Sequence, residues 1–419
     1  MYPFNKITTL LLAAFMAASI YACVEKGNSQ NATTESSAGL AVMDKIPALL
    51  DRPENLWYGN EWQTTQNAYG KARQELIKDP NAKEPWLNLA EVFILEARVT
   101  GEHPHYYPAA LQVLDEMLSK NFDPKDMRDM DLKFRGLSDK ASVELSLHEF
   151  ARALETGKQA VEINPHNAAV YGVLVDANVE LGHYKEAVKM ADKMVSIRPD
   201  LRSYSRVSYL REIYGDVNGS IEAMDMAVKA GAPGTDQTAW TRLTLGNLYK
   251  HYGKDKEAEM QYLIILEERP DYPFALAALG NIETERKNYT KALDYLQKAA
   301  AIIPEVSFYE GMAKVYKATG QQDQLQKTVD EIIAMMEDDA AHGHNMDLEF
   351  AKVYADLKGD PAKALTYAQK EYDRRPDNID VNGEMADLYF KMGDNQKAKM
   401  HLEKALRTGS KKPEWLALK

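Results

Sequence analysis

The strongest constraint on the fold of this chain is a 34-residue interval that recurs between prolines. Pro165, Pro199 and Pro233 are spaced at this interval, and Pro270 and Pro304 repeat it further along. A repeat of this length is one supersecondary unit, which buries its apolar face only against its neighbours. The chain is therefore expected to grow by stacking units, and its 419 residues need not divide into separate globular domains.

Each interval is typical of two amphipathic helices joined by a turn. Apolar residues recur every three or four positions, a glycine such as Gly182 separates the two helical stretches, and a proline closes the unit. Small residues recur where two helices must approach closely: Gly246, Gly280 and Ala386 in first helices, and Ala187, Ala258, Ala292 and Ala398 in second helices. The pattern predicts an all-α fold built from helical hairpins.

One unit carries a specific family pattern. Leu245-Gly246-x-x-Tyr249, followed by Ala258, Tyr262 and Pro270, resembles the tetratricopeptide repeat. The resemblance covers residues 60–419 and implies a right-handed superhelical α-solenoid of about eight to nine hairpins. In that family the first helix of each hairpin lines a concave face that binds peptides or partner helices. The whole chain is also similar to tetratricopeptide lipoproteins of the Bacteroidetes.

Two segments depart from the repeat. Residues 100–108 lengthen the spacing before Pro124 and are expected to form an insert between two helices. Residues 305–345 start as an ordinary unit but lack its closing proline, which predicts an irregular unit. Inserts in solenoids often lie on a functional face, although a neutral insertion is the simpler explanation.

The first residues resemble an export signal. Lys6 is followed by an apolar run too short to span a membrane, and then by Ile20-Tyr21-Ala22-Cys23, which resembles a bacterial lipobox. Cys23 is the only cysteine of the chain. We expect a signal peptide over residues 1–22, lipidation of Cys23, a flexible tether over 23–50 and the solenoid over 51–419. The protein would then be exported and membrane-anchored at the outer membrane, on its periplasmic or surface side.

The search for chemistry argues against an enzyme. The net charge of −12 disfavours nucleic acid as a partner, and no P-loop, Gly-x-Ser-x-Gly or His-Glu-x-x-His motif is present. We therefore predict no catalytic residues and no cofactor. Two His-x-His pairs, His103/His105 and His342/His344, are expected in loops far apart in the array. The neighbouring Glu102 and Asp338/Asp339 could complete a site, but metal sites normally need three or four ligands in a fixed arrangement, so we predict no metal site at either pair.

The concave face is the remaining candidate site. Asn247 and Asn281 each follow the small residue of a first helix and are 34 residues apart, so they should form a short ladder. An amide both donates and accepts, and can therefore pair with an extended backbone of any sequence. The predicted partner-binding patch comprises Arg206, Tyr209, Trp240, Asn247, Lys250 and Asn281.

Three functions remain open at this point. The first is a membrane-tethered scaffold or adaptor that binds partner proteins or peptides on the concave face. The second is a nutrient-binding surface lipoprotein for glycans or peptides, although its family relatives build such sites from longer loops than this chain has. The third is a metal-dependent enzyme.

Overall fold

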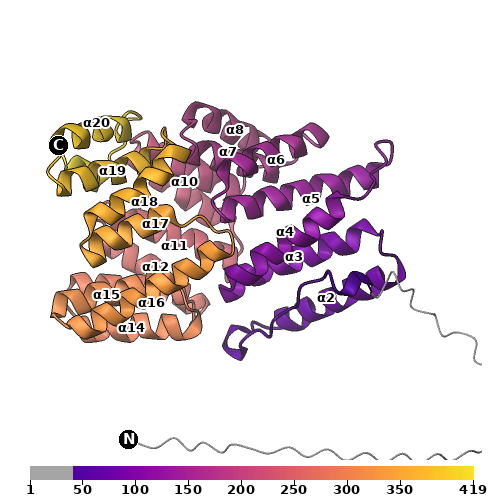
Figure 1. The fold of residues 1–419 in the computed structure, drawn as a ribbon, viewed down its shortest axis with the longest axis horizontal. Helices are drawn as coiled ribbons and strands as arrows, with labels where there is room; N and C mark the ends of the chain where they lie inside the picture. The colour runs from indigo at the N-terminus through magenta and orange to yellow at the C-terminus, as the bar shows by residue number, and fades with distance from the viewer. Residues whose placement is uncertain (1–40) are drawn as a thin grey trace, which may run out of the picture.

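The computed structural model describes residues 41–419, and every regular element in this part of the chain is helical (Figure 1). A 3-10 turn (Glu54–Leu56) comes first, and a π-helical turn (Tyr354–Lys358) extends α17. The helices are α2 (Glu61–Lys78), α3 (Lys83–Thr100), α4 (His103–Leu118), α5 (Met127–Ser146), α6 (Phe150–Ile163), α7 (Ala168–Glu180), α8 (Tyr184–Ile197), α9 (Leu201–Ile213), α10 (Val217–Ala230), α11 (Asp236–His251), α12 (Asp255–Glu268), α13 (Pro273–Glu285), α14 (Tyr289–Ile302), α15 (Val306–Thr319), α16 (Gln322–Ala341), α17 (Asp347–Val353), α18 (Pro361–Arg374), α19 (Ile379–Lys391), α20 (Asn395–Ala405) and α21 (Pro413–Leu416).

Neighbouring helices pack in pairs, from α3 with α4 to α19 with α20. This gives nine hairpins within residues 41–419, with α2 before the first and α21 after the last. The predicted all-α solenoid of about eight to nine hairpins is confirmed. Figure 1 shows the hairpins following a curved path, so that α17 to α19 lie in front of α10 to α12 in that view.

Local chemistry fixes where helices begin and end. At the start of α9 the Asp200 carboxylate accepts the backbone N–H groups of Arg202 and Ser203 at 3.0 and 3.1 Å, and the Ser203 hydroxyl accepts the Asp200 N–H at 2.9 Å. This capping box satisfies amides that have no partner within the helix. After α7, Gly182 has a φ of +78°, a conformation that is cheap only for glycine.

Within a hairpin the two helices touch where the repeat places small residues, as predicted. A Cβ on Gly280 would lie 2.8 Å from Leu296 Cγ, and a Cβ on Gly246 would overlap the ring of Tyr262. Tyr262 is 1% exposed, so its ring has no room to move aside. The facing Ala258 and Ala292 are fully buried.

We expect Gly246→Ala to lower the free energy of unfolding by about 1–3 kcal/mol, because the added methyl group overpacks the contact with Tyr262. Gly70→Ala is the matched control. Gly70 lies inside α2, and a Cβ there meets nothing within 4 Å. The control should stabilise the protein by about 0.5–1 kcal/mol through the helix preference of alanine. Urea titration followed by circular dichroism measures both, and equal effects would contradict the packing argument.

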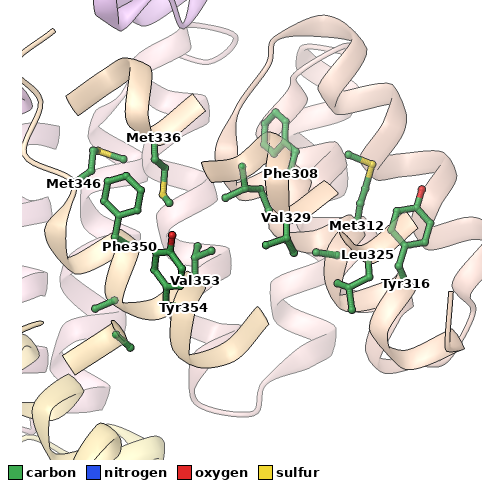
Figure 2. Packing of buried hydrophobic residues seen from close by; sticks show 14 of the residues in the cluster. Phe308, Met312, Tyr316, Leu325, Val329, Met336, Met346, Phe350, Val353 and Tyr354 are labelled. Carbon is green, nitrogen blue, oxygen red and sulfur yellow. The ribbon is translucent and has the colours of Figure 1, made fainter. Parts of the chain in front are cut away.

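The largest apolar cluster runs through the hairpins from α13 to α20, and Figure 2 shows its centre. Phe308 from α15 lies beside Val329 from α16, and Met336 lies beside Met346 and Phe350 at the start of α17. The segment 305–345 therefore forms a hairpin, and its irregularity lies in the length of α16. That helix has 20 residues, against 14 in α14, and buries Met336 completely.

The folded body begins before residue 51. Val42 and Ile46 are buried in the first apolar cluster, Gln112 donates to the Lys45 carbonyl at 2.8 Å, and the Leu50 amide donates to the Tyr106 hydroxyl at 3.1 Å. Residues 41–50, which were expected to belong to the tether, thus pack against α4. The predicted tether was extended too far, from the polar residues 23–40 into a segment whose Val42 and Ile46 are buried.

The segment 100–108 lengthens a helix and does not form a loop. Gly101 ends α3 with a φ of +74°, and α4 begins at His103 with Pro104 in its first turn, where proline costs no hydrogen bond. Tyr106 and Tyr107 are buried against α3 and α5. The expectation that His103 and His105 occupy a loop was wrong, because the buried tyrosines continue an apolar helical face through the insert.

Successive turns of the superhelix touch each other edge to edge. The Asn345 amide donates to the Leu147 carbonyl at 3.1 Å, and the Thr408 hydroxyl donates to the Ile213 carbonyl at 2.7 Å. The second pair is separated by 195 residues. Further hydrogen bonds, ion pairs and cation–π contacts bridge the same two edges. We call this line of contacts the seam; it joins Tyr58 with Arg269, Leu147 and His148 with Asn345, Glu180 with Arg375 and Asn378, Tyr184 with Ile379, and Ile213 with Thr408.

The seam also has a core. Val179 and Ile213 from the first turn share one apolar cluster with Ile379, Leu402 and Trp415 from the second. Arg375 is 6% exposed and pairs with both Glu180 and Glu371. The seam thus buries apolar side chains and an ion pair, as a structural interface does, and is more than a contact between exposed surfaces.

Candidate functional site

The two residues of the predicted amide ladder lie on neighbouring first helices. Asn247 on α11 and Asn281 on α13 are both exposed, because the small residue before each one turns toward the second helix of its hairpin. The Asn247 Oδ1 accepts the Tyr262 hydroxyl at 2.7 Å, which orients the amide and leaves its N–H₂ group free to donate. The two amides occupy equivalent positions on neighbouring first helices.

Aromatic side chains extend this surface. Trp240 on α11 is 51% exposed and meets Phe274 on α13 edge to face, with ring centroids 5.2 Å apart. Phe274 in turn contacts Phe308 at 5.4 Å. The sequence prediction included Trp240 and missed Phe274, although the two residues are 34 apart and the repeat itself signals their pairing.

Three members of the predicted patch are held by their own chain. Arg206 pairs with Asp176 through two hydrogen bonds and also donates to the Gly172 carbonyl at 3.1 Å. Lys250 pairs with Asp255 and Glu285. Tyr209 packs against the seam, and burial raises its pKa well above the usual value. These groups shape the surface, whereas Trp240, Asn247 and Asn281 are the ones that present free contacts. The patch as a binding site stays a prediction.

Further along the array, three successive first helices each carry a partly buried carboxylate. Glu310 on α15, Glu349 on α17 and Glu384 on α19 lie at comparable positions of three successive first helices. Burial is the main cause that raises the pKa of Glu384 to about 7, and the negative charges of Asp387 and Asp356 add to it. Burial also raises the pKa of Glu310. The sequence did not single out these residues, because acidic side chains are frequent throughout the chain.

Glu384→Gln should stabilise the fold at high pH only. The pKa of Glu384 lies above its value of 4.5 in the unfolded chain, so its favourable contribution is present at low pH and is lost as pH rises through about 7. Removing the carboxylate should therefore raise the free energy of unfolding at pH 8, on the order of 1 kcal/mol after solvent screening, and change little at pH 4. Urea titrations at both pH values test this. Glu403→Gln, at an exposed position of α20, is the control, and a stabilisation independent of pH would contradict the account.

The two histidine pairs lie together, contrary to the expectation that they lie far apart in the array. The superhelix brings α4 against α16, so His105 and His342 line one hollow of about 430 Å³. His344 meets His148 with ring centroids 4.6 Å apart, and both of its ring nitrogens are buried without a partner. Burial, with the charges of His148 and His103, lowers the pKa of His344 to about 3. Within residues 41–419, no three His, Cys, Asp or Glu side chains are grouped to hold a metal ion.

The membrane predictions concern another part of the chain. Cys23 and the predicted signal peptide lie outside the residues that the structure describes. From residue 41 onward, the structure contains no helix with both the length and the apolar character required to cross a bilayer.

A family model described as a tetratricopeptide repeat matches residues 144–212 and 357–419. These matches fall on hairpins of the described solenoid, including α7 with α8 and α19 with α20. The fold is a tetratricopeptide-repeat solenoid. The matched segments include the residues on both sides of the seam around Glu180 and Arg375.

Individual relatives of this chain are distant. Tetratricopeptide repeat protein 21B of Xenopus laevis is 23% identical over 294 residues, 64% of this chain and 22% of that protein. Protein O-mannosyl-transferase TMTC1 of Homo sapiens is 22% identical over 185 residues, 44% of this chain and 20% of that protein. The chain thus spans about a fifth of the length of these curated relatives. The solved structure of TTC0263, a thermophilic tetratricopeptide-repeat protein of Thermus thermophilus, has a TM-score of 0.39 and 22% identity, and the match covers 51% of this chain and 99% of that chain.

Proposed function

We propose that this protein is a scaffold of a bacterial envelope, tethered to the membrane by a lipid on Cys23, that binds a partner protein through an extended peptide segment. The observation that carries the proposal is the pair of exposed amides, Asn247 and Asn281, at equivalent positions beside the exposed ring of Trp240. A ladder of amides suits a main chain, and an adjacent aromatic wall suits an apolar side chain.

The transferase named among the relatives does not alter this proposal. Its name describes a protein of which this chain matches one fifth. A solenoid of stacked hairpins presents an extended surface, which serves recognition more readily than the enclosed site that catalysis requires. We therefore propose a binding role without a reaction, a cofactor or a nucleic-acid partner.

Site-specific photo-crosslinking in the native membrane tests the binding proposal. A photoreactive amino acid at Asn281 should capture a discrete partner, whereas the same group at Met260, exposed on α12, should not capture it. A synthetic peptide from the crosslinked segment should then bind the purified protein. We expect the double variant Asn247→Ala, Asn281→Ala to weaken that peptide at least tenfold, while Met260→Ala leaves the affinity unchanged. Equal affinities for both variants would reject the patch.

The lipid tether has its own test. Metabolic labelling with a radioactive fatty acid should mark the wild-type protein and not the Cys23→Ser variant, which should also leave the membrane fraction. A Cys23→Ser protein that stays fully membrane-bound would contradict the tether and would leave the peptide-binding test unaffected.

A saccharide is the second candidate ligand, favoured by one hollow near the start of the folded body. This hollow of about 750 Å³ lies between the residues before α2 and the first turns of that helix. Trp57 is half exposed there, with its indole N–H fixed by the Arg52 carbonyl at 2.9 Å. Amides from Asn60, Gln63 and Gln66 complete the lining. An aromatic wall with planar amides suits a sugar ring, and a glycan array in which wild type and Trp57→Ala behave alike would remove this candidate.

A further inference from the structure

We infer that the seam closes the side of the superhelix, so that a partner reaches the inner face only along the superhelix axis and as an extended polypeptide. The inference goes beyond the proposed function, because it concerns the route and the form in which a partner reaches the inner face. In an open solenoid the concave face is reached from the side, which accommodates helices and folded domains as well as peptides.

The seam extends over much of the chain. It starts before the first hairpin, where the Arg269 guanidinium lies 4.5 Å from the Tyr58 ring centroid. It continues at His148, whose Nδ1 lies 2.7 Å from the Asn345 carbonyl oxygen. It ends at Thr408 against Ile213. The contacts thus join the two edges from the segment before α2 to the turn after α9.

The two edges joined by the seam approach each other closely at two glycine turns. A Cβ on Gly182 would overlap the backbone of Asp377, and a Cβ on Gly215 would overlap the carbonyl oxygen of Gly409. Only glycine fits at these two turns, because both the left-handed backbone and the close approach exclude a side chain. Backbone therefore lies directly on backbone across the seam.

The inner face nevertheless remains in contact with solvent. Trp240, Asn247 and Asn281 are exposed although the edges are sealed. The inner face is exposed to solvent although the seam closes the side of the superhelix. Solvent must therefore reach it along the superhelix axis. An extended chain fits such an approach, and a folded domain does not.

Cysteine accessibility tests this inference in the full chain. In a Cys23→Ser background an introduced cysteine is the only thiol. Ser142→Cys places it on the inner side of α5, directly after the buried Ala141 and about 20 Å from the start of that helix at 1.5 Å per residue. Ser196→Cys, exposed on α8, is the matched outer control. Three maleimide probes are compared: N-ethylmaleimide, an unstructured peptide and a small folded domain.

The folded probe should react with Ser142→Cys at least tenfold more slowly than with Ser196→Cys, after each rate is divided by that of N-ethylmaleimide. The peptide probe should react with both sites within about threefold. Two seam variants should release the folded probe: Arg375→Ala, and the milder His148→Gly, which keeps the positive φ of residue 148. Equal rates of the folded probe at both sites, or exclusion that persists in both seam variants, would overturn the inference. Exclusion of the peptide probe would also overturn it.

Discussion

Replacing Glu96 with alanine should lower the free energy of unfolding by about 3–5 kcal/mol. Glu96 on α3 and Arg52, which precedes α2, form an ion pair in which both side chains are completely buried. Two hydrogen bonds join them, from Nε at 3.2 Å and from Nη2 at 2.5 Å. Without Glu96 the guanidinium keeps its burial but loses its full counter-charge, since Glu61 is 3.7 Å away and half exposed. The cost is that of leaving one charge buried and unpaired.

Glu84→Ala is the control for this prediction. Glu84 lies on the same helix and also pairs with an arginine, Arg128, but both side chains are largely exposed. An exposed pair contributes about 0–1 kcal/mol to stability, so Glu84→Ala should change the free energy of unfolding by no more than this. Denaturant unfolding with tryptophan fluorescence suits the comparison, because Trp62 stacks against Arg52. If the two variants lost the same stability, the buried pair would not hold the segment before α2 in place.

Replacing Arg375 with alanine should have a comparable effect at the seam, about 3–5 kcal/mol. Its guanidinium pairs with Glu371 and Glu180 and lies 4.7 Å from the ring centroid of Phe150. Removing it leaves Glu180 without its arginine partner and leaves Glu371, which is 3% exposed, paired with Arg374 alone. Because hairpins of a solenoid couple mainly to their neighbours, the loss should concentrate in α18 to α21, which would detach before the remainder unfolds.

Hydrogen exchange resolved by segment measures this outcome. In Arg375→Ala the amides of α19 and α20 should exchange faster, while those of α11 to α14 keep their wild-type rates. Arg198→Ala removes an exposed arginine paired with Asp200 and should leave every segment unchanged. A uniform increase across the whole array would contradict the description of the seam as a local interface.

The hairpins could be predicted from the sequence because their determinants are local. The 34-residue spacing, the glycine turns and small residues such as Gly246 act within one hairpin or between neighbours, where sequence distance and spatial distance agree. The same reasoning placed Asn247 and Asn281 at equivalent exposed positions. It also placed the tyrosines of the repeat, such as Tyr171 and Tyr316, in the core, where both are buried.

The seam could not be predicted in this way. Its contacts join residues about 195 positions apart, and they depend on the sum of small rotations between many successive hairpins. The same accumulation explains why His105 and His342 meet across one hollow. The docking of residues 41–50 was missed for another reason, since the polar composition of the preceding residues was extended across a segment that is mostly apolar.

The most direct test of the closed superhelix is the exchange rate of one amide, that of Ile379. It lies in the first turn of α19, where a backbone N–H has no acceptor within its own helix and normally exchanges quickly. Here it donates to the Tyr184 hydroxyl of the preceding superhelical turn at 2.8 Å. We predict that Ile379 is protected at least tenfold more than Thr290, a first-turn amide of α14, and that Tyr184→Phe removes most of this protection. Exchange of Ile379 as fast as Thr290 in the wild-type protein would contradict the closed seam.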